Sequence, residues 1–525
     1  MELPAMKLPV MRFPVILNVA KNLLHAALLL LPLSLGAQEV RDGTGYALNQ
    51  DLTLWAGSSN AAGLAISPYR QFNILSGQYK MENGEYRQMQ TGTQVGDLEF
   101  DTQGAKRIGK VQVWGRFRYN NVNDKGSSFN TLLYDPYDER FMYTAADTVA
   151  GQWKKQAYEM QFKAAMPLGE IFSAGVHVKY TDRIAAGQID PRAESYHYSV
   201  VARPGLVWTA GKSRIGANGL YSNTFERTTP SISNSEVVQK VFLMRGLGNW
   251  VGEQVGGGGL STMYFRCNTW GGAIQYAYDG SWELFSELSY ASHLTRITES
   301  ATQPKPHGRT RQQELGLNAA AVLRSERFTD KFSMNVGDVR TIGIEPTALW
   351  NGDKGEWEVQ MELEQCKFST SDVTLSYDRY LKDGDGYKWH LNGKLGFEAV
   401  HKSYASPLSE FQYGLLTASA GTEYKFRIGN GALLAGASAG WSKNLGNARY
   451  EYNGHRTGTA PVEVLYPHNL SILSADRLQG GISAEYCIPV GKVTSLAFCA
   501  EGDFLYAYAI SKSRTALLGA VRLYF

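Results

Sequence analysis

Residues 515–525 read TALLGAVRLYF, and this final stretch decides the fold that we expect. Side chains alternate between the two faces of a strand. One face of this strand would carry Leu517, Gly519, Val521, Leu523 and Phe525, and the other Leu518, Ala520, Arg522 and Tyr524. An apolar last strand with a terminal aromatic residue is typical of a closed β-barrel, in which the last strand pairs with the first. An ordinary C-terminal strand of a soluble sheet is the alternative.

The opposite end of the chain has the pattern of a secretory signal peptide. Lys7, Arg12 and Lys21 precede an apolar run that contains Pro32 and ends in small residues at Ala37. This run of about 15 residues is short for a membrane span, and proline weakens a helix. We therefore expect residues 1–37 to be a cleaved leader. No later run of 18 apolar residues occurs, which excludes a helical membrane protein.

Composition supports one large β-structure after the leader. The chain has 55 glycines and 30 tyrosines, and its net charge of +3 gives no reason to expect nucleic acid. No linker is visible, so we expect an N-terminal segment at 38–71 and one barrel at 72–525. Cys487 and Cys499 flank a turn and would lie too far apart to bridge each other. A disulfide that involves Cys267 or Cys366 stays open.

Strand-length segments with alternating polarity follow one another from residue 72 onward. The clearest is KVQVWGRFRYN at 110–120, in which Val113 and Phe117 alternate with Trp114 and Arg116. Tight turns alternate with long connections at 121–152, 226–267 and 444–475. The sequence therefore predicts an all-β, transmembrane, antiparallel up-and-down barrel of about 14–18 strands, with short periplasmic turns and long extracellular loops.

In such a barrel the charged face of each strand points into the lumen and the apolar face meets lipid. A basic stripe and an acidic stripe on different parts of the wall have two interpretations. The charges are either solvated and paired across strands, or they form a transverse field that tunes the passage of polar solutes. The candidate lumen-lining residues are Arg116, Arg118, His177, Lys179, Glu283, Glu287, Glu358, Glu362 and Glu364.

Two stretches resemble elements of known barrel proteins. The end of the chain resembles the C-terminal signal of bacterial barrel proteins, which implies recognition of Gly519, Val521, Leu523 and Phe525 by the barrel-assembly machinery. Early residues resemble the Asn-Pro-Ala-Gly-Leu element of long-chain fatty-acid transporter barrels, in which an N-terminal segment plugs the lumen. The matching residues, with alanine in place of proline, are Asn60, Ala61, Ala62, Gly63 and Leu64. A turn that leads into the first strand is the alternative.

Together with residues 54–64 and 110–120, this C-terminal end resembles uncharacterised outer-membrane barrels of Bacteroidetes, a family with no agreed activity to carry over. We expect a cell outer-membrane location, contact with membrane lipid, and passage of a small solute as a channel or transporter. A non-conducting barrel whose long loops dock a protein partner of an uptake or secretion complex is the first alternative. An embedded enzyme is the second.

No catalytic or metal-binding pattern stands out. Residues 436–440 match the letters Gly-x-Ser-x-Gly, but they continue a strand pattern where a nucleophile elbow needs a following helix. The nine histidines have no metal-ligand spacing. We therefore expect no enzyme activity and no cofactor or metal.

Overall fold

The computed structural model describes residues 42–67, 69, 71–234, 236, 240–255, 261–491 and 494–525. The predicted leader, residues 1–37, lies outside the described residues. The helical elements are few and short: α2 (Gly43–Leu52), η1 (Ala61–Ala65), η2 (Glu139–Phe141), the π-helical turn η3 (Pro461–Leu465) and α3 (Tyr466–Leu473). Among the described residues, no helix is both long and apolar enough to cross a membrane.

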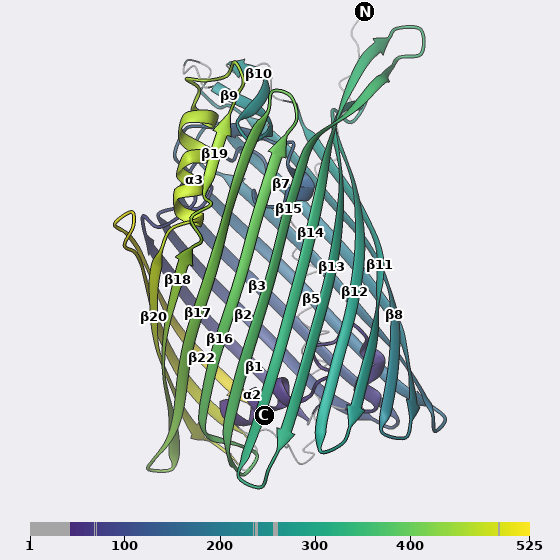
Figure 1. Cartoon of the computed structure of the whole chain (residues 1–525), viewed down its shortest axis with the longest axis vertical. Coiled ribbons are helices and arrows are strands. Elements are labelled where there is room, and N and C mark those ends of the chain that lie inside the picture. Colours follow the sequence, from purple (N-terminus) through teal and green to yellow (C-terminus); the bar gives the residue numbers. More distant parts are fainter. Residues whose placement is uncertain are drawn as a thin grey trace, which may run out of the picture. The chain divides into compact units, whose positions relative to one another are not determined.

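The rest of the structure is built from antiparallel strands (Figure 1). The first half of the chain contributes β1 (Phe72–Gly84), β2 (Gln94–Ile108), β3 (Val111–Ser127), β4 (Ala145–Asp147), β5 (Gly151–Leu168), β6 (Phe172–Gly187), β7 (Arg192–Ala210), β8 (Ser213–Ser231), β9 (Lys240–Gly246), β10 (Asn249–Val255) and β11 (Met263–Asp279). The second half contributes β12 (Trp282–Glu299), β13 (Lys305–Arg324), β14 (Phe328–Asn351), β15 (Glu356–Asp383), β16 (Gly386–Tyr404), β17 (Ser409–Ile428), β18 (Gly431–Asn444), β19 (Arg449–Tyr452), β20 (Arg477–Pro489), β21 (Ser495–Ala507) and β22 (Lys512–Tyr524).

The sheet closes on itself through its C-terminal stretch, residues 515–525. β22 pairs with β1 from Arg514 opposite Gly84 to Tyr524 opposite Ile74. The main sheet has 19 described strands, of which β19 pairs only with the outer end of β17, so 18 strands form the closed wall. This confirms the predicted antiparallel barrel. Closure matters in lipid because it leaves no unpaired edge among the backbone groups.

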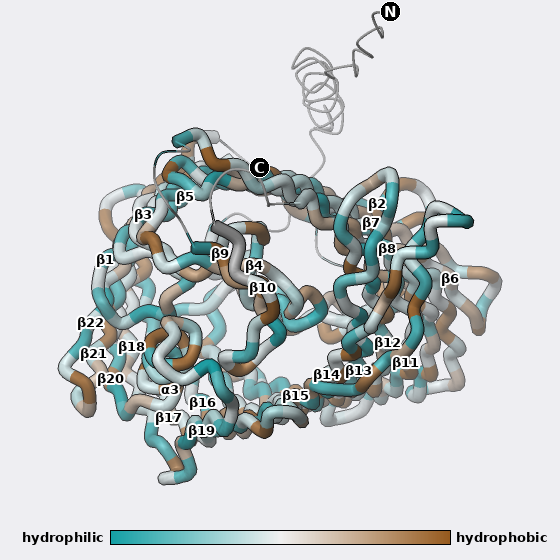
Figure 2. The backbone as a smooth tube through the Cα atoms, turned by 90° about the horizontal axis from the view of Figure 1, so that it is seen from above, coloured by the Kyte–Doolittle hydropathy of each residue, from teal (hydrophilic) through white to brown (hydrophobic). Residues whose placement is uncertain are grey.

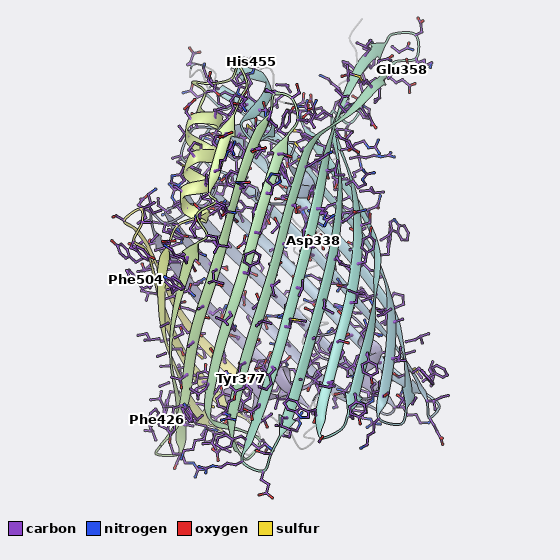
Figure 3. The ribbon with its side chains drawn as sticks, in the orientation of Figure 1. Asp338, Glu358, Tyr377, Phe426, His455 and Phe504 are labelled. Atoms are coloured by element: carbon purple, nitrogen blue, oxygen red, sulfur yellow. The ribbon has the colours of Figure 1, made fainter. Side chains whose placement is uncertain are left out.

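The two faces of the wall have the inverted polarity of a membrane barrel. Apolar side chains project outward, as Phe426 and Phe504 do in Figure 3, and Leu284 is 39% exposed. The inner face instead buries polar groups such as Asp101, Lys163 and Glu287. A soluble β-protein would show the opposite arrangement, so the outward band fits a lipid-facing surface. Its exposed members include Phe162, Leu206, Ile274, Leu288, Leu315, Leu395, Ile482, Leu517 and Val521.

Connections differ in length between the two barrel ends. Strands at one end are joined by short turns such as 109–110, 169–171, 211–212, 280–281 and 429–430. The long connections 128–150, 232–262 and 445–476 all lie at the other end, which we call extracellular. The four cysteines are free and buried, so none of them forms a disulfide.

Candidate functional site

The N-terminal segment, residues 42–67, lies inside the barrel near the end with the short turns, which we call periplasmic. Its helix α2 begins where the Asp42 side chain accepts a hydrogen bond from the Gly45 amide at 2.9 Å, a standard N-cap. The same carboxylate forms an ion pair with Lys425 of β17 at 2.7 Å. At the other end of the helix, the Tyr380 hydroxyl donates to Asp51. These contacts fasten α2 to the inner wall at β15–β17.

The second part of the segment is fastened to the opposite arc of the wall through Asn60. This residue has no exposed surface, and its side-chain nitrogen donates to the carbonyl oxygens of Leu206 and Ala217 and to Gln275. Its side-chain oxygen accepts from the Ala62 amide at 3.0 Å. Nearby, the Ser58 hydroxyl donates to Glu287 of β12 at 2.6 Å. Residues 58–62 are thus bonded to β7, β8, β11 and β12.

Glycines in the wall make this close contact sterically possible. A Cβ atom on Gly175 of β6 would lie 2.4 Å from the Ala62 backbone nitrogen, and one on Gly205 of β7 would lie 2.1 Å from the Asn60 side chain. No larger residue fits at these two positions without moving the segment. Residues 60–64, the stretch picked out in the sequence, therefore sit flush against the inner wall.

The extracellular connections form a second obstruction, which we call the cap. It contains the sheet β10–β9–β4 and the helix α3, and Figure 2 shows β4, β9 and β10 over the barrel interior. Trp250, Phe242 and Leu465 pack in its apolar core. Bonds to the inner wall hold it down: Glu139 pairs with Lys402 at 2.6 Å, and the Tyr134 amide donates to Glu226 at 2.8 Å.

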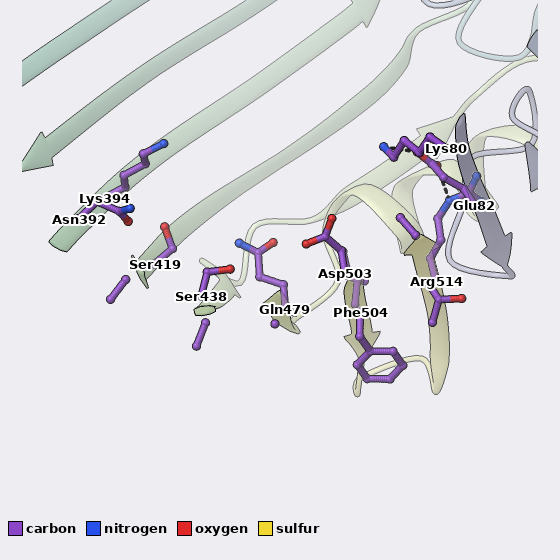
Figure 4. Close-up of a pocket in the computed structure, with 16 residues that line it drawn as sticks. Lys80, Glu82, Asn392, Lys394, Ser419, Ser438, Gln479, Asp503, Phe504 and Arg514 are labelled. Atoms are coloured by element: carbon purple, nitrogen blue, oxygen red, sulfur yellow. Dashed lines mark hydrogen bonds and ion pairs between the residues drawn. The ribbon is translucent and has the colours of Figure 1, made fainter. Parts of the chain in front are cut away.

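Between these two parts, a polar chamber lies along the inner face of β16–β18, β20–β22 and β1 (Figure 4). Its main cavity measures about 530 Å³. Neighbouring cavities of about 380 and 240 Å³ share lining residues with it and extend it toward α3 and toward Glu423. Its inward-facing lining includes Lys80, Glu82, Asn392, Lys394, Ser419, Ser438, Gln479, Asp503 and Arg514.

Small residues create this chamber by alternating with polar ones across neighbouring strands. One row runs through Asn392, Gly421, Ser438, Gly481 and Asp503, each opposite the next. A Cβ atom on Gly421 would lie 2.9 Å from the Asn392 side chain, and one on Gly481 would lie 2.6 Å from that of Asp503. The longer polar side chains therefore lie flat over glycines and leave the middle of the lumen free.

Ionised groups in the chamber are only partly neutralised. Glu82 pairs with Lys80 at 2.6 Å and with Arg514 at 3.0 Å. Lys394 and Asp503 are exposed to the lumen and form no ion pair within the part of the chain that the structure describes. Unpaired charges of both signs, beside amides and hydroxyls, suit a polar solute or water.

Six of the predicted lumen-lining residues lie on the inner face. Arg116 and Arg118 of β3 lie beside Asp101, at 2.6 and 3.3 Å, and Lys179 of β6 pairs with Glu159 at 2.7 Å. His177 and Glu287 are buried on the part of the inner wall where the N-terminal segment packs. Glu283 forms an ion pair with Arg324 at 2.5 Å. These charges are largely paired across neighbouring strands, as the first of the two interpretations expects.

The predicted acidic stripe lies elsewhere, and its assignment to the lumen is wrong. Residues 356–365 of β15 have no partner in β16, and the β14–β15 hairpin rises above the rim there, with Glu358 near its tip (Figure 3). Glu362 and Glu364 pair with the outward-facing Arg309 and Arg311, at 2.8 and 3.2 Å. Two shifts in the register of β15 against β14, at Gln365 and Gln360, interrupt the predicted alternation, and the first part of this 28-residue strand extends past the wall.

The chamber residues on β16–β21 were missed because their strands look plain in the sequence. Segments such as LLAGASAG at 433–440 contain mostly small residues, and they carry no motif apart from the misleading Gly-x-Ser-x-Gly. The glycines and serines at inward positions of adjacent strands could have predicted the chamber, because small inward side chains leave space in the lumen. Within the described residues, no group of three or more His, Cys, Asp or Glu side chains could hold a metal ion.

The fold and its interior define a class: a closed, 18-stranded transmembrane β-barrel whose lumen holds its own N-terminal segment. Within that class, the chain belongs to a family of unknown function (DUF6850), whose model matches residues 61–525. No curated protein sequence matches the chain. The predicted Bacteroidetes origin and the likeness to fatty-acid transporters stay predictions.

Solved structures with a similar barrel are distant in sequence. BauA, the ferric preacinetobactin receptor from Acinetobacter baumannii, is 9% identical, with 87% of this chain and 80% of that one covered and a TM-score of 0.41. YddB, an outer membrane transporter from Escherichia coli, is 8% identical, with 86% and 81% covered and a TM-score of 0.39. At this distance the likeness extends to the barrel fold alone.

Proposed function

We propose that the protein admits a small polar solute through the outer membrane by way of the chamber. The N-terminal segment and the cap act as its two gates. The observation that carries this proposal is the polar cavity of about 530 Å³ that lies between the N-terminal segment and the cap. Pockets of this size and larger accommodate small ligands. An 18-stranded wall is wide enough to leave an aqueous lumen, so the obstructions are added features of this chain.

Filling the chamber tests this proposal. Ser438→Trp places a large side chain in the chamber, so solute entry into proteoliposomes should fall roughly fivefold or more, because pore width limits passage. The control is Ala435→Trp, three residues away on the outward face of the same strand, where tryptophan meets lipid. Equal entry rates in the wild type and the Ser438→Trp variant would contradict a route through the chamber.

A specific feature favours docking of a protein partner as a second candidate function. The hairpin at 345–365 carries both acidic and exposed apolar side chains, and neither of its edges is paired with a neighbouring strand. An isolated two-stranded hairpin is marginally stable in water, so a covering surface would stabilise it. Its exposed apolar side chains are Leu349, Trp350, Val359, Met361 and Leu363.

The partner that fits this hairpin is a protein with an apolar surface bordered by basic residues. The hairpin carries six acidic residues and Lys354, a net charge of 1 − 6 = −5. The test is binding of a synthetic Lys/Val alternating strand peptide to the full chain in nanodiscs. We expect Met361→Ser with Leu363→Ser to weaken binding roughly tenfold by removing apolar contact. Binding that is unchanged in this variant would argue against the docking function.

A further inference from the structure

Three basic side chains form a row across the inner wall beside the N-terminal segment. Lys163 of β5 lies directly opposite His177 of β6, and His177 lies directly opposite Arg203 of β7. Neighbouring strands lie about 4.8 Å apart, so the two cations, Lys163 and Arg203, are separated by about 10 Å with the imidazole of His177 between them. Repulsion between these two cations favours a compensating negative group.

The wall places no carboxylate within ion-pairing distance of this row, as far as the described residues show. Among the described residues, no ion pair within 4.0 Å joins any member of the row to a carboxylate, whereas Lys179 in the next row has Glu159 at 2.7 Å. Lys163 donates to the Ala56 carbonyl oxygen at 2.9 Å. Glu287 of β12 attracts Lys163 and Arg203 electrostatically, but it lies beyond 4.0 Å from both and accepts from the Ser58 hydroxyl at 2.6 Å.

The imidazole at the centre of the row has one unused nitrogen. His177 is 6% exposed, and its Nε2 lies 3.3 Å from the Gln161 side-chain oxygen. Because that oxygen accepts, Nε2 carries the proton, and Nδ1 is left as an acceptor. Nδ1 is buried and has no hydrogen-bonding partner in the part of the chain that the structure describes. Buried polar atoms are normally satisfied, so a missing donor at Nδ1 points to a ligand.

We propose that Lys163, His177 and Arg203 bind an oxyanion that also carries an O–H group, such as a phosphate monoester or a hydroxy-carboxylate. The two cations meet the negative oxygens, and the ligand's O–H donates to Nδ1 of His177. This inference rests on the proposed solute passage and names its substrate class. The ammonium group of Lys163 has three donors, so it can contact the anion and still donate to the Ala56 carbonyl oxygen of the N-terminal segment.

Arg203→Gln is the informative variant. The Arg203 side chain makes no hydrogen bond to any described residue, so its replacement leaves the wall's own bonding intact. Titration of inorganic phosphate into the detergent-solubilised full chain should show binding weakened roughly tenfold, the usual effect of losing a charge-assisted hydrogen bond. The matched control, Lys179→Gln, also removes one positive charge from the neighbouring row, but that charge is already paired, so phosphate binding should stay within about twofold of the wild type.

Flux separates this site from solute passage in general. In proteoliposomes, gluconate and glucose 6-phosphate at limiting concentration should enter faster than glucose, and Arg203→Gln should abolish that preference, so that the two anions enter no faster than glucose. The ratio of the two anions tells a carboxylate from a phosphate. Phosphate binding that is equal in the wild type and Arg203→Gln overturns the anion site. Phosphate binding without entry of any solute keeps the site and overturns the proposed passage.

Discussion

Removing either gate alone leaves the barrel nearly closed, and removing both opens it. We expect this from planar-bilayer recordings of four forms of the protein: the wild type, a deletion of residues 42–67, a replacement of residues 240–255 by a short Gly-Ser linker, and the combination. Two constrictions in series each limit the current, so the double variant should conduct roughly tenfold more than either single variant.

The wall should survive both changes, because neither removes a barrel strand. Closure rests on β1 and β22, whose ladder runs from Gly84 to Ile74 and lies outside both deleted stretches. The wall groups that Asn60 and Ser58 satisfy, such as Gln275 and Glu287, would face water in the lumen once the segment is gone. Heat-modifiable gel mobility checks that each form is a folded barrel.

The control for the deletion is a substitution that dislodges the segment without shortening the chain. Gly175→Val places a side chain against the Ala62 backbone, where even a Cβ atom would come within 2.4 Å, so the segment must move. Gly219→Val on β8 meets nothing within 4 Å and should behave as the wild type. A single deletion that conducts as well as the double variant would show that only one gate exists.

The barrel could be predicted from sequence because its determinants are local and repeated. Alternation at 110–120 and at 515–525 fixes which side chains face lipid, and turn residues at 211 and 429 fix where strands reverse. Inward positions such as Arg116 and Lys179 follow from the same period of two. The end of the barrel that carries the long loops also follows, since the three long connections come after β3, β8 and β18, which are even numbers of wall strands apart.

What the sequence left open depends on how far each strand extends and on which strands lie side by side. Glu358 has the right alternation for the lumen, yet its part of β15 stands above the rim, because no neighbouring strand accompanies it there. The basic row needs the register of three strands, which placed the overlooked Lys163 and Arg203 on either side of the predicted His177. The chamber depends on inward glycines such as Gly481, whose effect is visible only once strands are paired.

The second large effect concerns pH and the cap. Asp147 of β4 is 5% exposed in the cap sheet, and burial raises the pKa of its carboxyl to about 7, although the Val149 amide donates to it at 2.6 Å. The open cap would return this carboxyl to water and to an ordinary pKa near 4. Between about pH 4 and pH 7 the open form therefore loses its proton first, and the closed form is destabilised as pH rises.

We expect the fraction of open cap to rise up to about tenfold per pH unit across that window, and to level off above pH 7, where both forms are ionised. Hydrogen exchange of residues 129–147, corrected for the intrinsic pH dependence of exchange, measures this opening. Asp147→Asn keeps the shape of the side chain without a titrating group, so its protection at pH 8 should match that of the wild type at low pH. Asp135→Asn changes an exposed carboxylate in the same loop and should leave the wild-type profile in place. β4 pairs with β9 through Asp147 and Val241, so loss of protection that spreads to residues 240–246 would mean that this one carboxyl controls the whole cap sheet. A pH response that persists in Asp147→Asn would place the control at another residue.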